Sequence, residues 1–213
     1  MPRRTSIPVI GLVGGIGSGK SALTRITAER HNFVIVDADA IGHDVLRDPS
    51  VREAVRARFG DDIFDKRNQI LRSALAHRVF GSSVEASSRR ADLEAIVHPA
   101  IQKAILQQIN TIRSDESAAG IFLDAAVMLE AGWTRVVDYI VFVEVPYEVR
   151  LKRVEETRNW DETELKKREA SQLALEEKRE QADFVLQNAA DLESGAAQLE
   201  DIVSQILTGE SDL

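Results

Sequence analysis

The sequence predicts an α/β fold with five parallel strands in one sheet and helices between them. A short apolar run at residues 8–13 passes directly into glycines, which is typical of a buried parallel strand. A second apolar run at residues 33–37 follows after one helical stretch. A strand, a helix and a strand within about thirty residues form a βαβ unit, and such units indicate a parallel sheet covered on both faces.

The remaining elements follow in chain order. After Lys20, apolar residues recur at helical spacing, and we expect this helix to end near His31 and Asn32. Three further runs of strand-forming residues complete the sheet, at residues 121–124, 139–143 and 184–186. Together these elements predict a doubly wound core.

Long helical stretches separate some of the strands. Residues 42–110 show helical periodicity and no convincing strand, and a crossover between parallel strands needs only one helix. We therefore expect an inserted helical lobe at 42–110. Residues 147–181 form a second helical stretch, rich in both basic and acidic side chains. We expect one domain over 1–213, whose core comprises 7–41, 118–146 and 182–208.

Composition excludes several classes of function. The formal net charge is −8 over 213 residues, which argues against binding to nucleic acid or to an acidic membrane surface. Cysteine is absent, so disulfides and thiolate metal sites are excluded. No segment approaches the roughly 20 apolar residues that span a bilayer. We also expect no export signal, because no apolar region of sufficient length follows the basic residues Arg3 and Arg4. We expect a cytoplasmic protein.

The turn after the first strand carries the strongest motif. Gly14, Gly19, Lys20 and Ser21 match the pattern G-x-x-x-x-G-K-[ST], between a buried strand and a helix. Glycines allow backbone amides to approach phosphate oxygens, and the start of the helix adds positive potential. The predicted nucleotide contacts are Gly14, Gly15, Ile16, Gly17, Ser18, Gly19, Lys20, Ser21 and Ala22.

Two side chains of this loop have expected roles in phosphoryl transfer. Lys20 would reach the β- and γ-phosphates of ATP, and the hydroxyl of Ser21 would bind Mg²⁺. The loop alone serves GTPases, ATP-driven motors and small-molecule kinases. The Asn-Lys-x-Asp segment with which GTPases read guanine does not occur here, and motor ATPases normally need a larger domain.

Further segments make the sequence similar to one kinase family. They include 11–21, Val36-Asp37-Ala38-Asp39, 96–99, Leu129-Glu130, 146–153, Ser171-Gln172, 176–178 and 182–188, in family order. The chain resembles the dephospho-coenzyme A kinases, which transfer the γ-phosphate of ATP to a ribose 3′-hydroxyl in the last step of coenzyme A synthesis. The resemblance implies a P-loop kinase core, a helical acceptor lobe at 42–110 and a basic lid at 147–181. ATP, Mg²⁺ and dephospho-coenzyme A are the implied ligands, and we expect a monomer.

Two carboxylates follow the second strand, at the sheet edge where ligands bind. In an extended segment Asp37 and Asp39 would point to the same face. The resemblance favours Asp39 as the catalytic carboxylate that accepts the proton of the attacking hydroxyl, with Asp37 as a metal-site residue. Alternatively, one of them caps a helix that begins near Ala40. Asp124, at the end of the third strand, is an equally open choice between a magnesium carboxylate and a helix cap. Glu130, a few residues further on, is also open as a residue that touches magnesium-bound water or the substrate.

Basic and polar residues later in the chain have weaker signals. The resemblance marks Arg153 as a catalytic lid arginine, because guanidinium can neutralise a transferring phosphoryl group, with Arg150 and Arg158 in support. Asn188 is expected beside the nucleotide. His98 is a candidate for the acceptor site or a structural histidine, and Pro99 is expected at the first position of a long helix.

Two other readings stay open at this point. The chain could be a kinase for uridine, a nucleoside monophosphate or a similar acceptor. It could also be a nucleotide-binding module that has lost transfer. The presence of Lys20, Ser21, Asp39 and Arg153 together favours an enzyme.

Overall fold

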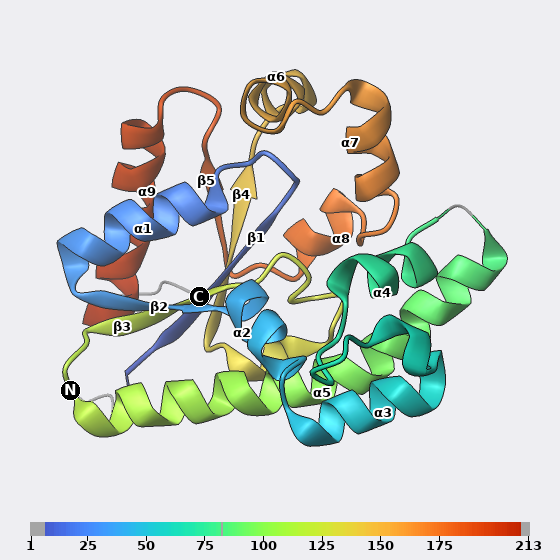
Figure 1. Cartoon of the computed structure of the whole chain (residues 1–213). Helices are drawn as coiled ribbons and strands as arrows, with labels where there is room; N and C mark the ends of the chain where they lie inside the picture. The colour runs from blue at the N-terminus through green and yellow to red at the C-terminus, as the bar shows by residue number, and fades with distance from the viewer. Residues whose placement is uncertain (1–6, 82, 210–213) are drawn as a thin grey trace. The chain divides into compact units, whose positions relative to one another are not determined.

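The computed structural model describes residues 7–81 and 83–209. Five strands form one parallel sheet in the order β2-β3-β1-β4-β5 (Figure 1). Their bounds are β1 (Val9–Gly14), β2 (Phe33–Asp37), β3 (Gly120–Asp124), β4 (Tyr139–Glu144) and β5 (Phe184–Gln187). The predicted number, position and parallel direction of the strands are confirmed.

The chain divides into two compact units, one of residues 1–37 and 108–213 and one of residues 38–107. The sheet belongs to the first unit. The helices that lie wholly in this first unit are α1 (Lys20–His31), η2 (Trp133–Val136), α6 (Tyr147–Arg158), α7 (Glu162–Glu169), α8 (Leu175–Glu180) and α9 (Leu192–Thr208). Helix α1 ends at the expected place, with Asn32 as its left-handed cap.

Helices α1 and α9 cover one face of the sheet (Figure 1). Apolar side chains that alternate along the strands are buried beneath these two helices. Ile10 and Leu12 of β1 and Val141 and Val143 of β4 point to this face, as expected when successive side chains of a strand alternate. The helices contribute apolar residues at helical spacing, which in α9 are Ala196, Leu199, Ile202, Val203 and Ile206. This packing fixes the start of α1, and with it the turn that follows β1.

The second unit is helical among its described residues, apart from one isolated antiparallel bridge between Phe64 and Ile70. Its elements are α2 (Ala38–Val45), α3 (Pro49–Phe59), η1 (Asp61–Ile63), α4 (Arg72–Val79) and most of α5 (Val84–Asp115). Val51, Val55 and Phe59 form the buried side of α3. The unit therefore has apolar side chains of its own to bury.

Helix α5 differs from the expectation at Pro99. Pro99 lies in the interior of α5 and not at its first position. Proline removes one backbone donor, and the helix on both sides supplies enough other hydrogen bonds to continue through it. Burial lowers the pKa of His98, next to Pro99 in the same helix.

No helix in the described part of the chain is both long and apolar enough to cross a membrane.

Candidate active site

The turn between β1 and α1 has the backbone of an anion-binding loop. Gly14, Gly17 and Gly19 have φ values of 146°, 80° and 88°, which side chains rarely tolerate. A Cβ atom on Gly14 would lie 2.6 Å from the carbonyl oxygen of Val143. Glycine is therefore required at these positions by backbone geometry and by space.

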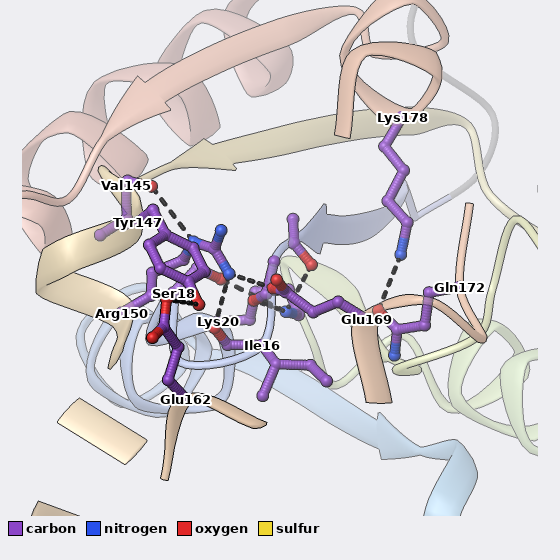
Figure 2. A network of polar contacts seen from close by, with 12 residues as sticks. Ile16, Ser18, Lys20, Val145, Tyr147, Arg150, Glu162, Glu169, Gln172 and Lys178 are labelled. Carbon is purple, nitrogen blue, oxygen red and sulfur yellow. Dashed lines mark hydrogen bonds and ion pairs between the residues drawn. The ribbon is translucent and has the colours of Figure 1, made fainter. Parts of the chain in front are cut away.

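Lys20, the first residue of α1, folds back over the loop. Its Nζ donates to the carbonyl oxygens of Gly14 at 3.0 Å and Gly15 at 3.1 Å. It also donates to the hydroxyl of Ser18 at 3.3 Å (Figure 2). Burial is the main cause that lowers the pKa of Lys20 to about 8. The ammonium thus lies among oxygen acceptors in the position from which it can meet a phosphate.

Other charged side chains act on the same ammonium. The positive charge of Lys178 lowers the pKa of Lys20 further, the carboxylate of Asp124 raises it, and Arg158 and Arg150 lower it. Several cations therefore gather around the loop, although the whole chain carries a net charge of −8. This local positive charge is what a phosphorylated ligand needs.

Two carboxylates lie side by side at the carboxyl edge of the sheet. Asp37 ends β2, Asp124 ends β3, and the two residues are partners in the parallel register. Asp39 is placed differently from the expectation, because α2 begins at Ala38 and Asp39 lies in its first turn. The prediction that Asp37 and Asp39 share a face of one extended segment is wrong, since a helical turn rotates the chain between them.

The donor set suits a magnesium ion. The described residues contain no group of three or more acidic or histidine side chains arranged to hold a metal. Mg²⁺ is commonly held by one or two carboxylates together with substrate phosphates and water, so such a group is not required. Asp37, Asp124 and the hydroxyl of Ser21 in the first turn of α1 are oxygen ligands of the kind that this ion prefers.

Arg153 and Asn188 meet at the end of the phosphate loop. Arg153 Nη2 donates to the carbonyl oxygens of Asn188 at 2.9 Å and Ala190 at 3.4 Å, and its Nη1 is buried without a hydrogen bond. Asn188 is 1% exposed, and its Nδ2 donates to the carbonyl oxygen of Ser18 at 2.8 Å. Asn188 thus contacts the loop directly at Ser18, and Arg153 contacts the segment after β5 that contains Asn188.

Sequence reasoning missed a buried polar cluster beside the lid segment. Lys178 is 2% exposed and forms an ion pair with Glu130 at 2.7 Å. Lys178 also donates to Gln172 Oε1 at 3.2 Å, and the amide of Leu173 donates to Glu130 Oε1 at 3.0 Å. Glu130, Gln172 and Lys178 all lie in segments that resemble the kinase family, and that was the available signal.

Comparisons with known proteins agree with this geometry. A family model described as dephospho-CoA kinase matches residues 8–194. A dephospho-CoA kinase of Corynebacterium diphtheriae is 37% identical over 183 residues, which cover 85% of this chain and 88% of that protein. A Thermus thermophilus crystal structure has a TM-score of 0.75 at 28% identity, covering 94% of this chain and 98% of that chain.

A more distant structure supports the fold class. The shikimate kinase of Acinetobacter baumannii has a TM-score of 0.53 at 15% identity, covering 97% of this chain and 96% of that chain. At this identity the likeness concerns the fold alone. The predicted fold class, an α/β P-loop kinase core with a parallel sheet, is confirmed.

Proposed function

The chain belongs to the dephospho-CoA kinase family, and from that membership we propose that it transfers the γ-phosphoryl group of ATP to the ribose 3′-hydroxyl of dephospho-coenzyme A. The observation that carries the transfer chemistry is the position of Lys20. Its ammonium lies over a glycine loop and among further cations, where it can neutralise charge on the β- and γ-phosphates. Family membership supports the choice of acceptor.

The phosphate loop binds and orients ATP. Its backbone amides and the N-terminus of α1 favour the polyphosphate, and residues 14–22 form this contact. Lys20 holds the γ-phosphoryl group while the bond between this group and the departing ADP breaks. Arg153 is proposed as a catalytic arginine, and its Nη1 makes no hydrogen bond within the protein. Asn188 supports the same nucleotide from behind the loop.

Carboxylates supply the proton acceptor and the metal ligands. Asp39 accepts the proton of the 3′-hydroxyl as that oxygen attacks. Ser21 and Asp37 would hold Mg²⁺, with Asp124 in register beside Asp37. When bound, the ion would neutralise negative charge on the phosphates of ATP.

The two long helical stretches, at 42–110 and 147–181, are proposed to bind the acceptor and to cover the site. We assign acceptor binding to the lobe at 42–110, which overlaps the compact unit of residues 38–107. The lid at 147–181 contains α6, α7 and α8, and it would exclude water from the transferring group. The protein is expected to act as a monomer.

A panel of acceptors tests the proposed reaction. The chain is incubated with ATP, Mg²⁺ and, in separate reactions, dephospho-coenzyme A, uridine or a nucleoside monophosphate. The proposal predicts phosphorylation of dephospho-coenzyme A at a far higher kcat/KM than of the other acceptors. Preference for a nucleoside would support a different small-molecule kinase, and ATP binding without any transfer would support a binding module.

A further inference from the structure

A phosphate loop works only if its carbonyl groups are held away from the ligand. When the amides of successive residues point inward, the carbonyl oxygens point outward and need donors elsewhere in the protein. The carbonyls of Gly14 and Gly15 are not held outward in this way, because they accept hydrogen bonds from Lys20 on the side where the phosphates would bind. Those of Ile16 and Ser18 receive side chains from distant parts of the chain, namely Arg150 and Asn188.

Arg150 lies against the outer side of this loop. Its side chain is 4% exposed, its Nη1 donates to the Ile16 carbonyl at 3.2 Å, and its Nε donates to the Val145 carbonyl at 3.3 Å. A Cβ atom on Gly15 would lie 2.6 Å from Nη1. Gly15 thus leaves the space that the guanidinium occupies, and Arg150 is a buried support and not a mobile lid side chain.

The same guanidinium also holds the lid segment. Arg150 Nη1 forms an ion pair with Glu169, the last residue of α7 (Figure 2). A buried guanidinium is costly without a partner charge, so this contact is expected to persist. One nitrogen atom therefore joins the backbone of Ile16 to the end of a lid helix.

We propose that Arg150 is a positioning residue that couples the lid to the phosphate loop. By holding the Ile16 carbonyl outward it keeps the neighbouring amides directed at the phosphates, and through Glu169 it ties the position of α7 to that of the loop. When ATP binds and fixes the loop, this existing contact should further slow the opening of α7. Only the expected effect on turnover rests on the proposed kinase function. The coupling between ATP binding and α7 does not depend on it.

Four variants separate this role from a merely structural one. Arg150→Met removes the guanidinium. Arg150→Lys keeps the charge, but its single nitrogen cannot occupy the separate positions of Nε and Nη1, from which Arg150 reaches the carbonyls of Val145 and Ile16. Glu169→Gln keeps the shape of the side chain and removes the charge that binds Arg150. Glu164→Gln is the matched control, since Glu164 forms an ion pair with Arg168 on the surface of the same helix, at 2.6 Å.

The variants are compared by calorimetry with ATP, by hydrogen exchange with and without ATP, and by steady-state kinetics. Loss of the Arg150 guanidinium should weaken ATP binding about 10- to 100-fold, the range expected for a charge-assisted hydrogen bond. Glu169→Gln should bind ATP within about threefold of the unaltered chain, because the contacts of Arg150 to the loop remain. ATP should then slow exchange in 14–22 but no longer in 162–169, and kcat should fall while the KM for ATP stays unchanged. Glu164→Gln should behave as the unaltered chain.

Three results would overturn the proposal. They are an unaltered ATP affinity in folded Arg150→Met or Arg150→Lys, no protection of 162–169 by ATP in the unaltered chain, or equal behaviour of Glu169→Gln and Glu164→Gln. If Arg150→Met fails to fold, the ATP affinity of Arg150→Lys and the hydrogen exchange of Glu169→Gln test the proposal in its place. Should the unaltered chain bind ATP and phosphorylate no dephospho-coenzyme A, the proposed function fails, and the exchange experiment still decides the coupling.

Discussion

At the scale of single residues, Lys20 makes ATP binding sensitive to pH. Burial holds the pKa of Lys20 at about 8 in the free protein, below the usual 10.5, and a polyphosphate favours the protonated amine. ATP affinity should therefore be full below pH 8 and fall as the pH rises through that value, with uptake of a proton on binding in the alkaline range. Calorimetry from pH 7 to 9.5, in buffers of different ionisation enthalpy, measures both effects.

Lys20→Arg is the control for this titration, because arginine stays charged throughout the range. Its ATP affinity should show no decline near pH 8. A flat affinity in the unaltered chain, with no proton uptake, would mean that Lys20 keeps its proton in the free protein.

Asp37 at the end of β2 and Asp39 in the first turn of α2 have separable roles. Asp39→Asn keeps the shape of the side chain but cannot accept a proton, so turnover should fall about 10²- to 10⁴-fold while the acceptor still binds. Asp37→Asn should lose less and recover in part at raised magnesium, since Asp37 lies beside Asp124 in the sheet register. Turnover and ATP affinity across a magnesium titration distinguish the two. The opposite result would be that magnesium restores turnover in Asp39→Asn and does not restore it in Asp37→Asn. Asp37 would then be the proton acceptor and Asp39 the metal-site residue.

At the scale of elements, α9 packs closely at Gly195 against Asn188, the residue that supports the phosphate loop. Replacing a helical glycine by alanine normally stabilises a protein by about 0.4–1 kcal/mol. Here the new Cβ would lie 2.5 Å from Asn188 Oδ1 and 3.0 Å from Leu23 Cδ2. Gly195→Ala should therefore lower the free energy of unfolding by about 1–3 kcal/mol, the usual cost of overpacking.

The same substitution should also weaken ATP binding, because Asn188 holds the Ser18 carbonyl of the loop. Urea unfolding and calorimetry with ATP measure the two effects. Ser194→Ala, at the exposed neighbouring position, should change neither. A stabilised Gly195→Ala with normal ATP affinity would show that Asn188 can move away at no cost.

At the scale of the whole molecule, the two compact units are proposed to bind different substrates. ATP should slow hydrogen exchange in residues 14–22, and dephospho-coenzyme A should slow it within 42–110. The reason is that the glycine loop belongs to the unit with the sheet, whereas most of the lobe belongs to the unit of residues 38–107. Protection of the lobe by ATP alone, and of the loop by the acceptor alone, would overturn this division.

Sequence patterns predicted the sheet well because buried parallel strands are continuous apolar runs, and all five lie where those runs occur. They also located the loop, since glycine at left-handed positions is a local requirement. The start of α2 at Ala38 and the continuation of α5 through Pro99 were not predicted, because packing overrides local capping preferences. The buried positions of Arg150 and Lys178 depend on contacts between distant segments, which charge patterns along a helix do not reveal.

The site of phosphorylation in the product decides whether the chain transfers phosphate to the proposed acceptor position. The chain is supplied with ATP, Mg²⁺ and dephospho-coenzyme A, and the product is analysed by phosphorus and proton magnetic resonance. We expect a new phosphate on the ribose 3′-oxygen, formed by the unaltered chain and abolished in Lys20→Ala. Phosphate at another position, or transfer by Lys20→Ala within a few-fold of the unaltered rate, would contradict this expectation.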